Sequence, residues 1–405
     1  MKGTFQAVQI TDRVYWVGAI DWNLREFHGY ATPRGTTYNA FLVLADKVTL
    51  IDTVKAPFFD EMLGRIASVI APSDIAYVVS NHSEMDHSGS LPRLIEAANP
   101  EDVFASAQGV KALEAHFHTD GSVRAVKDGE RVSLGDVELT FIETRMLHWP
   151  DSMFTLMADE GVLFSQDAFG MHLASSELFA DRLDQSLLEF EAGKYYANIL
   201  MPLSNLVKKL LGKLAGALGD VKMILPDHGP IWREDVSWIV DRYAKWAERK
   251  PTKKALVVYD TMWESTDMMA RAIADGLMAG GAKPTLMRAA RAHRSDIATE
   301  LLDAGALIVG SPTVNNTIFP GMADVMTYVK GLRPQNLIGT AFGSYGWSGE
   351  AVRQLTDMLA EMKVDVVGDG VKCQYVPDGH ALAACRSLGI HIAERLDTIC
   401  GNRPQ

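Results

Sequence analysis

The chain has 405 residues, of which 47% are hydrophobic and 22% charged, with a formal net charge of −12 and a pI near 5.4. This composition is that of a globular protein, and the length exceeds what one hydrophobic core usually holds, so two domains are expected. The acidic charge argues against nucleic acid or an anionic membrane as a main partner, because both require a basic surface.

Short runs rich in β-branched and aromatic residues dominate the first part of the chain. They span residues 13–20, 36–45, 47–52, 76–81, 137–144, 153–167 and 221–229. Such runs predict β-strands, several of them joined by tight turns. Two stretches, 88–98 and 196–218, have the apolar spacing of helices. Residues 1–250 are therefore predicted to form an α/β domain in which helices flank a sandwich of sheets.

The pattern changes at a basic, proline-containing segment near residue 250. Such a segment is typical of a solvated linker, so the sequence predicts a domain boundary there. Beyond it, predicted strands at 253–260, 283–289, 305–312, 335–344 and 363–370 alternate with helical segments. This alternation predicts a doubly wound parallel sheet for residues 251–405.

A dense group of ionisable side chains follows the predicted strand 76–81. Within the segment NHSEMDHSG, two histidines and two carboxylates fall in six positions, and three later strands each end at a histidine or an aspartate. One such residue is usually a turn or cap residue, but several together favour a metal, because buried charge needs a partner. The candidates exceed the needs of one tetrahedral ion and predict two ions. They are His82, Glu84, Asp86, His87, His148, Asp167 and His228.

This pattern resembles the metallo-β-lactamase superfamily, whose hydrolases carry the motif HxHxDH, a later histidine, a bridging aspartate and a final histidine. The resemblance implies an αββα sandwich for the first domain. The chain differs at Glu84, which stands where those enzymes usually have the second histidine. Three carboxylates and four imidazoles form a harder, more anionic set than a typical dizinc site, and this favours iron.

Three loops of the second domain follow predicted strands and carry hydroxyls, amides or aromatic rings. The first has no lysine and no GxxxxGK[ST] motif, so it is not a Walker loop, whereas hydroxyls at a helix N-terminus can hold a phosphate monoester. Serine and threonine at such positions are otherwise ordinary helix caps. In an open parallel sheet these loops border the crevice in which cofactors bind. The candidate residues are Thr261, Met262, Trp263, Glu264, Ser265, Thr266, Ser311, Pro312, Thr313, Val314, Asn315, Asn316, Ser344, Tyr345, Gly346 and Trp347.

Residues 251 to about 400 resemble flavodoxin, which binds FMN. A carboxylate-modified metallo-β-lactamase-like domain followed by a flavodoxin-like domain resembles the flavodiiron proteins over essentially the whole chain. The resemblance implies reduction of dioxygen to water, of nitric oxide to nitrous oxide, or of both, with electrons passing through FMN to a diiron site. The implied sites are one iron on His82, Glu84 and His148, a second iron on Asp86, His87 and His228, and Asp167 as the bridge.

The alternative function is that of a dizinc hydrolase with an accessory flavodoxin-like domain. Glu84 and the complete set of flavin loops both count against this alternative. Four other residues could support the metal site: His28 and Asp52 by orienting ligands, and Tyr195 and Trp149 by lining the pocket, although ordinary structural roles explain them as well. The remaining histidines are expected to be surface or packed residues. They are His116, His118, His172, His293, His380 and His391.

The flavodiiron resemblance also implies partners. No CxxC pair is present for a fused rubredoxin, so an external donor is expected, with rubredoxin preferred over a reduced deazaflavin or another flavoprotein. A head-to-tail homodimer or a dimer of dimers is implied in the same way. The three cysteines, Cys373, Cys385 and Cys400, are widely spaced and do not suggest a disulfide framework. Neither a signal peptide nor a membrane-spanning run is evident, so a cytoplasmic location is predicted.

Overall fold

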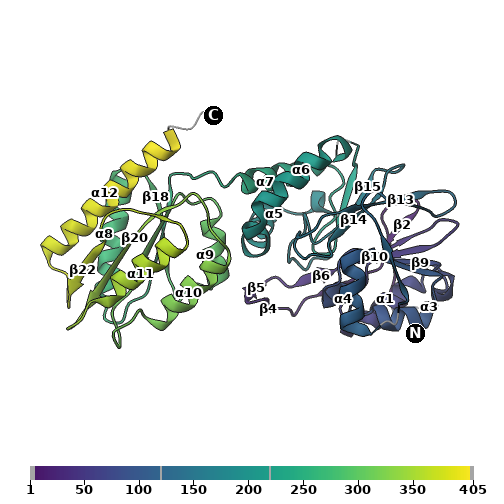
Figure 1. The fold of residues 1–405 in the computed structure, drawn as a ribbon, viewed down its shortest axis with the longest axis horizontal. Helices are drawn as coiled ribbons and strands as arrows, with labels where there is room; N and C mark the ends of the chain where they lie inside the picture. Colours follow the sequence, from purple (N-terminus) through teal and green to yellow (C-terminus); the bar gives the residue numbers. More distant parts are fainter. Residues whose placement is uncertain (1–4, 119–120, 219, 402–405) are drawn as a thin grey trace. The chain divides into compact units, whose positions relative to one another are not determined.

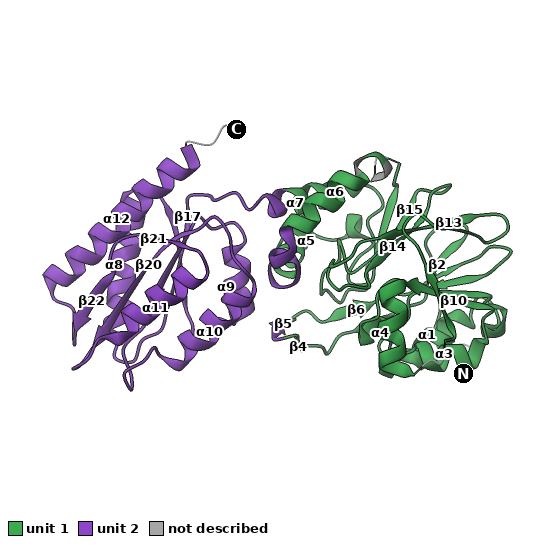
Figure 2. Cartoon of the chain, viewed as in Figure 1, with its two compact units in different colours: residues 1–28, 32–195, 205–244 green, residues 29–31, 196–204, 245–405 purple. Residues whose placement is uncertain are grey.

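The computed structural model describes residues 5–118, 121–218 and 220–401 (Figure 1). The chain forms two compact units (Figure 2). The first comprises residues 1–28, 32–195 and 205–244, and the second comprises residues 29–31, 196–204 and 245–405. Short segments from the first half of the chain therefore belong to the second unit. Among the described residues, no helix combines the length and the apolar character needed to cross a lipid bilayer.

Two sheets form the centre of the first unit. The larger has the spatial order β1 (Val8–Gln9), β2 (Val14–Trp16), β7 (Phe41–Val43), β8 (Thr49–Ile51), β9 (Tyr77–Ser80), β10 (Asp102–Ser106) and β11 (Val123–Val126). Its strands from β8 onward are parallel to one another. The smaller has the order β12 (Arg131–Ser133), β13 (Glu138–Glu143), β14 (Met153–Met157), β15 (Val162–Gln166) and β16 (Met223–Pro226).

Apolar side chains from the two sheets meet in one core. Phe41 and Phe104 of the larger sheet lie in the same cluster as Phe141 and Phe164 of the smaller, and all four are at most 1% exposed. Each ring buried in this way contributes on the order of 2 to 3 kcal/mol to the free energy of unfolding. The sandwich keeps the carboxyl ends of β9, β13, β15 and β16 available for the polar segments that follow them.

Helices cover the outer faces of the sandwich. Helices α1 (Phe59–Ile66), α3 (Leu91–Ala98) and α4 (Ala107–Phe117) bury their apolar side against the larger sheet. Helices α5 (Gln185–Tyr195), α6 (Ser204–Leu218) and α7 (Val236–Glu248) follow the smaller sheet in the chain, and Tyr243 of α7 packs on Phe169 after β15. The expected αββα sandwich is confirmed.

The second unit is built on one parallel sheet. Its order is β18 (Lys283–Arg288), β17 (Lys254–Tyr259), β19 (Ala306–Gly310), β20 (Ile338–Tyr345) and β21 (Asp365–Val366), and β22 (Val371–Gln374) also pairs with β20. Alternate residues of β17 pack into two different cores. Leu256 packs in one core with the helices α9 (Arg294–Leu301), α10 (Pro320–Gly331) and α11 (Glu350–Glu361). Val257 packs in the other core with α8 (Ser265–Ala279) and α12 (Gly379–Gly401). Helices thus cover both faces, which confirms the predicted doubly wound sheet.

The local structure differs from the sequence prediction in two helical segments. The expected helix 196–218 is a π-helix at Tyr196–Leu200, a 3-10 turn at Met201–Leu203 and α6 from Ser204. Pro202 explains the break, because proline has no N–H to continue an α-helix. The expected helix 88–98 begins at Leu91, and residues Met85–Ser88 form a separate short helix, α2.

Several short elements complete the description. They are β3 (Ala19–Asp21), β4 (Glu26–Phe27), β5 (Tyr30–Ala31), β6 (Thr36–Tyr38) and the 3-10 turns Ala56–Phe58, Pro72–Asp74 and Ala180–Arg182. Strand β6 pairs with β3 and leads directly into the strand β7 of the larger sheet.

Candidate metal centre and flavin site

The loop after β9 places four of the predicted ligands in a turn that is fixed at its start. Asp52, which follows β8, accepts hydrogen bonds from Asn81 N at 2.7 Å and from Asn81 Nδ2 at 2.8 Å. Helix α2 then begins after Glu84, and Ser88 Oγ donates to Ser83 O at 2.7 Å. The four side chains brought together by this turn are His82, Glu84, Asp86 and His87.

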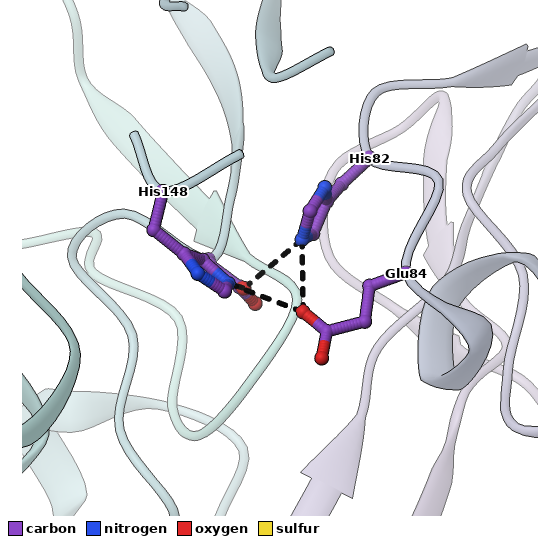
Figure 3. A group of neighbouring side chains, drawn as sticks. His82, Glu84 and His148 are labelled. Carbon is purple, nitrogen blue, oxygen red and sulfur yellow. Dashed lines mark hydrogen bonds and ion pairs between the residues drawn. The ribbon is translucent and has the colours of Figure 1, made fainter. Parts of the chain in front are cut away.

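A first set of ligand atoms gathers around Glu84. Its Oε2 lies 3.1 Å from His82 Nε2 and 3.2 Å from His148 Nε2. Asp167 Oδ2 joins them at 2.8 Å from His148 Nε2 and 3.6 Å from His82 Nε2. Figure 3 shows His82 and Glu84, from the loop after β9, and His148, from the loop after β13, pointing toward one another. One ligand atom from each of the four residues lies within 4.8 Å of the others, a spacing that one ion can bridge.

A second set lies on the other side of Asp167. Asp86 Oδ2 is 3.2 Å from His228 Nε2 and 3.4 Å from His87 Nε2. The second oxygen of Asp167, Oδ1, lies 3.2 Å from His87 Nε2 and 3.5 Å from His228 Nε2. Asp167 therefore presents one carboxylate oxygen to each set.

Several buried polar atoms of these two ligand sets lack a hydrogen-bond partner among the described residues. Within the described part of the chain, no hydrogen bond reaches either carboxylate oxygen of Asp86, either ring nitrogen of His87 or Asp167 Oδ1, and all are buried. Burial alone would raise the pKa of Asp167, but the charge of His87 and a hydrogen bond from His148 hold that pKa well below its usual range. Buried carboxylate and imidazole atoms that lack hydrogen bonds need another partner, and a metal ion can be that partner. The residues present fit two metal ions.

Acceptors behind the histidines decide which ring nitrogen faces the centre. Asp151 Oδ2 lies 3.1 Å from His82 Nδ1, and Thr37 O lies 2.6 Å from His228 Nδ1. Each Nδ1 therefore carries a proton to donate, and Nε2 keeps its lone pair for a metal. Asp227 Oδ2 lies 3.4 Å from His87 Nδ1, but the two atoms form no hydrogen bond.

Asp151 and Asp227 were missed by sequence reasoning, although each lies next to a predicted ligand. Asp151 is the third residue after His148, and Asp227 immediately precedes His228. Asp151 Oδ2 also accepts hydrogen bonds from Ser83 N at 2.6 Å and Ser83 Oγ at 2.8 Å, so it ties two ligand-bearing loops together.

Three of the four residues considered as supports lie beside the metal ligands, and the fourth, Asp52, contacts the segment that carries them. His28 Nε2 is 2.7 Å from Glu84 Oε1, the oxygen that faces away from His82 and His148. Asp52 acts through Asn81, as described above. The ring of Trp149 meets that of His82 edge to face at 5.2 Å, and Tyr195, fully buried, lies 6.2 Å from the ring of His228.

Among the six histidines expected to be surface or packed residues, His172 packs against a ligand. It is buried, its ring is 4.7 Å from that of His228, and its Nδ1 lies 2.9 Å from Thr36 Oγ1. It is a packed residue, as predicted, but its place beside a ligand could not be read from the sequence. His293 instead caps α9 by accepting a hydrogen bond from Ser295 N.

A pocket of about 390 Å³ lies at the carboxyl ends of the second unit's strands. This volume is in the range of small-molecule sites. Three residues that were not predicted, Ser348, Tyr375 and Val376, also line it. The predicted residues in its lining are Met262, Trp263, Ser265, Pro312, Thr313, Asn315, Asn316, Ser344, Tyr345, Gly346 and Trp347. The five predicted residues outside the lining are Thr261, Glu264, Thr266, Ser311 and Val314.

The chemistry of this pocket fits a flavin mononucleotide. Trp263 and Trp347 are 81% and 87% exposed, so their rings are free to stack on a planar ligand. Ser265 opens α8, and the N–H groups at a helix start attract a phosphate. Thr261 lies outside the pocket lining, but its hydroxyl is buried without a hydrogen-bond partner among the described residues, as expected of a group that pairs with a bound phosphate.

Comparisons with known proteins agree on both halves of the chain. A family model described as ODP family beta lactamase matches residues 36–229, and a flavodoxin model matches residues 257–389. A protein of Moorella thermoacetica named nitric oxide reductase is 46% identical over 96% of this chain and 99% of its own length. A rubredoxin-oxygen oxidoreductase of Megalodesulfovibrio gigas is 50% identical over 96% of this chain and 98% of its own length.

Solved structures also match nearly the full chain. The rubredoxin oxygen:oxidoreductase from Desulfovibrio gigas is 48% identical and superposes with a TM-score of 0.95 over 97% of this chain and 99% of that one. The flavodiiron protein from Giardia intestinalis is 33% identical, with a TM-score of 0.95 over 100% of both chains.

Proposed function

The chain belongs to the flavodiiron protein family, and from this membership we propose that it reduces dioxygen to water, nitric oxide to nitrous oxide, or both. Electrons pass through FMN to two iron ions. The observation that carries this proposal is the gathering of seven buried or nearly buried ligands into two sets that share Asp167.

We assign the ligands by these two sets. One iron is held by His82, Glu84 and His148, the other by Asp86, His87 and His228, and Asp167 bridges them. The distances from Glu84 Oε2 and Asp86 Oδ2 to the neighbouring histidine nitrogens support this division. The choice of iron is supported by three carboxylates in a set that contains no thiolate.

Both reactions consume electrons and protons in fixed amounts: dioxygen takes four of each to give two waters, and two nitric oxide molecules take two of each to give nitrous oxide and water. When bound, the ferrous ions supply two electrons and open positions for the gas, and reduced FMN supplies two more. The protein's side chains and backbone position the groups that would hold the metal ions. Asp167 joins the two sets, and Asp151 and Thr37 O fix the protons of His82 and His228 on Nδ1. The burial of these side chains limits the access of water to the reacting gas.

FMN is assigned to the pocket of the second unit. The loops 261–266, 311–316 and 344–347 supply its contacts, with the phosphate at the start of α8 and the flavin ring beside Trp263 and Trp347. The pocket lining and the free hydroxyl of Thr261 support this assignment.

The electron donor is an external rubredoxin, a choice supported by the name of the Megalodesulfovibrio gigas relative. Head-to-tail pairing of two copies would bring the FMN of one subunit beside the irons of the other. A cytoplasmic location fits the three free cysteines, since reducing compartments keep thiols unpaired.

The proposal is tested by following gas consumption. The purified protein, loaded with iron and FMN and supplied with reduced rubredoxin, is given dioxygen or, in a separate anaerobic assay, nitric oxide. Faster turnover of one gas identifies the main substrate. Oxidation of the donor without consumption of either gas would contradict the proposal and revive the hydrolase alternative. The Asp167→Ala variant is the control for turnover that does not depend on the iron site.

A further inference from the structure

Arg288 lies at the carboxyl end of β18, beside the loop that leads from β17 into α8. In the parallel pair of strands, Arg288 is in register with Tyr259, the residue that precedes this loop. The loop, residues 260–264, has the sequence Asp-Thr-Met-Trp-Glu and contains neither lysine nor glycine. A cation near the phosphate end of the pocket must therefore come from outside the loop.

One guanidinium contacts the start and the end of the loop. Arg288 Nε lies 3.3 Å from Asp260 Oδ1, and Nη2 donates to Thr261 O at 3.1 Å. Its third nitrogen, Nη1, lies 3.4 Å from Glu264 Oε1. The side chain of Arg288 is 23% exposed and that of Asp260 2%, so this pair is shielded from water, whereas the side chain of Glu264 is 61% exposed. The planar fork of arginine can make all three contacts at once, which an ammonium group cannot do with the same geometry.

The conformation of the loop depends on such contacts. Glu264 has φ +63°, in the left-handed region that residues with a Cβ rarely adopt. It is also the N-cap of α8, so its backbone sets the direction of the helix's first N–H groups. A change at Glu264 would therefore move the groups that face a phosphate at the helix start.

The charge of the loop also calls for a cation. Asp260 is 1% exposed, and its Oδ1 accepts the N–H of Thr261 at 2.8 Å, so one carboxylate lies directly behind the phosphate loop. Glu264 adds a second. A phosphate monoester brings about 1.5 to 2 further negative charges at neutral pH. Without Arg288, these groups would repel the phosphate that the loop is shaped to hold.

Resting on the proposed role of FMN as the cofactor, we propose that Arg288 is a positioning residue for the flavin phosphate. Its contacts fix Thr261 and Glu264 beside the start of α8 and offset the carboxylates of Asp260 and Glu264. Arg288 thereby gives the pocket a preference for FMN over riboflavin, which lacks the phosphate.

The test compares binding of FMN and of riboflavin to the full-length protein after its flavin has been removed. The variants are Arg288→Gln, Arg288→Lys and, as a matched control, Arg271→Gln. Arg271 pairs with Asp267 of α8 at 2.6 Å, but its side chain is 72% exposed. Flavin fluorescence is titrated at low and at high salt, and circular dichroism checks that each variant is folded.

Arg288→Gln should lower the affinity for FMN by about 10-fold to 100-fold, as expected for the loss of hydrogen bonds between charged groups. The affinity for riboflavin should change by less than about threefold, because riboflavin makes no phosphate contact. Arg288→Lys, which keeps the charge without the fork, should show a smaller loss for FMN that salt changes little. The loss in Arg288→Gln should shrink at high salt, because the charge that it lacks is then screened in the unchanged protein too. Arg271→Gln should leave both affinities near those of the unchanged protein.

Equal losses for FMN and riboflavin in the folded Arg288 variants would overturn the inference, since they would indicate a general structural role. Unchanged FMN affinity would overturn it as well. If Arg288→Gln does not fold, the ratio of the two affinities in Arg288→Lys decides by the same criterion. Failure of the unchanged protein to bind FMN is a separate result, which would contradict the proposed function instead.

Discussion

Replacing Asp151 should weaken iron binding without disturbing the flavin. Asp151 Oδ2 lies 3.1 Å from His82 Nδ1 and accepts hydrogen bonds from Ser83 N at 2.6 Å and Ser83 Oγ at 2.8 Å. Asparagine can still present one oxygen to these donors but carries no charge. Alanine leaves all three donors, which are buried, without their acceptor.

The expected magnitudes follow from these contacts. Residues that orient metal ligands change metal affinity by about 10-fold to 100-fold when they are replaced. We place Asp151→Asn near the lower value, because the geometry is kept, and Asp151→Ala near the upper value. Alanine should also lower the free energy of unfolding by about 2 to 4 kcal/mol, because buried donors are left unpaired.

The assay is an anaerobic titration of the metal-free protein with ferrous iron against a competing chelator, paired with urea unfolding. The matched control is Asp128→Asn, which changes a half-exposed carboxylate of the same unit that pairs with Lys213 at 2.8 Å. If Asp151→Ala bound both irons as tightly as the unchanged protein, the orienting role of Asp151 would be wrong, whatever its effect on unfolding.

Three further predictions concern the ligands and the flavin loop. Asp167→Ala should abolish gas reduction and leave FMN bound, because only Asp167 faces both ligand sets among the described residues. Steady-state turnover measures the first effect and the flavin spectrum the second, and retained turnover would contradict a bridging role. Replacing Thr261 and Ser265 together with alanine should lower FMN affinity by about 10-fold or more at unchanged iron content, and equilibrium dialysis that finds equal affinity would argue against the proposed phosphate loop. Glu84→His should raise the ratio of bound zinc to bound iron, which elemental analysis measures, and an unchanged ratio would show that Glu84 does not select the metal.

The fold could be predicted where the sequence pattern is strong. The doubly wound sheet was predicted from the alternation of strands and helices after residue 250. Its parallel strands are easy to recognise, because strands buried on both faces have continuous apolar runs such as that of β19. Strand β22 was missed because its residues are alternately half-buried and exposed, and it has no apolar run. The break at Pro202 was also missed, since the apolar spacing on either side of it continues as if one helix were present.

The candidate site was predictable in its ligands but not in their supports. A histidine or a carboxylate at the end of a strand is visible in the sequence, and several such strands imply a common centre. The role of Asp151 depends on a partner 69 residues away, and nothing in the residues around it specifies that contact. Tyr375 and Val376 were not predicted to line the flavin pocket, because they follow β22, a strand that was itself not predicted.

Glu84 shows how one departure from a motif is matched elsewhere in the structure. Its Oε2 faces His82 and His148, while its Oε1 lies 2.7 Å from His28 Nε2. Burial alone would raise the pKa of Glu84, but its hydrogen bonds with His148, His28 and His82 lower that pKa, so the carboxylate stays ionised. A histidine at position 84 could offer one nitrogen to a metal, but it could not serve as an anionic partner for His28 as well. The carboxylate that makes the ligand set more anionic is thus also the group that fixes His28 beside the metal centre, and a reversion to the hydrolase motif would disturb both.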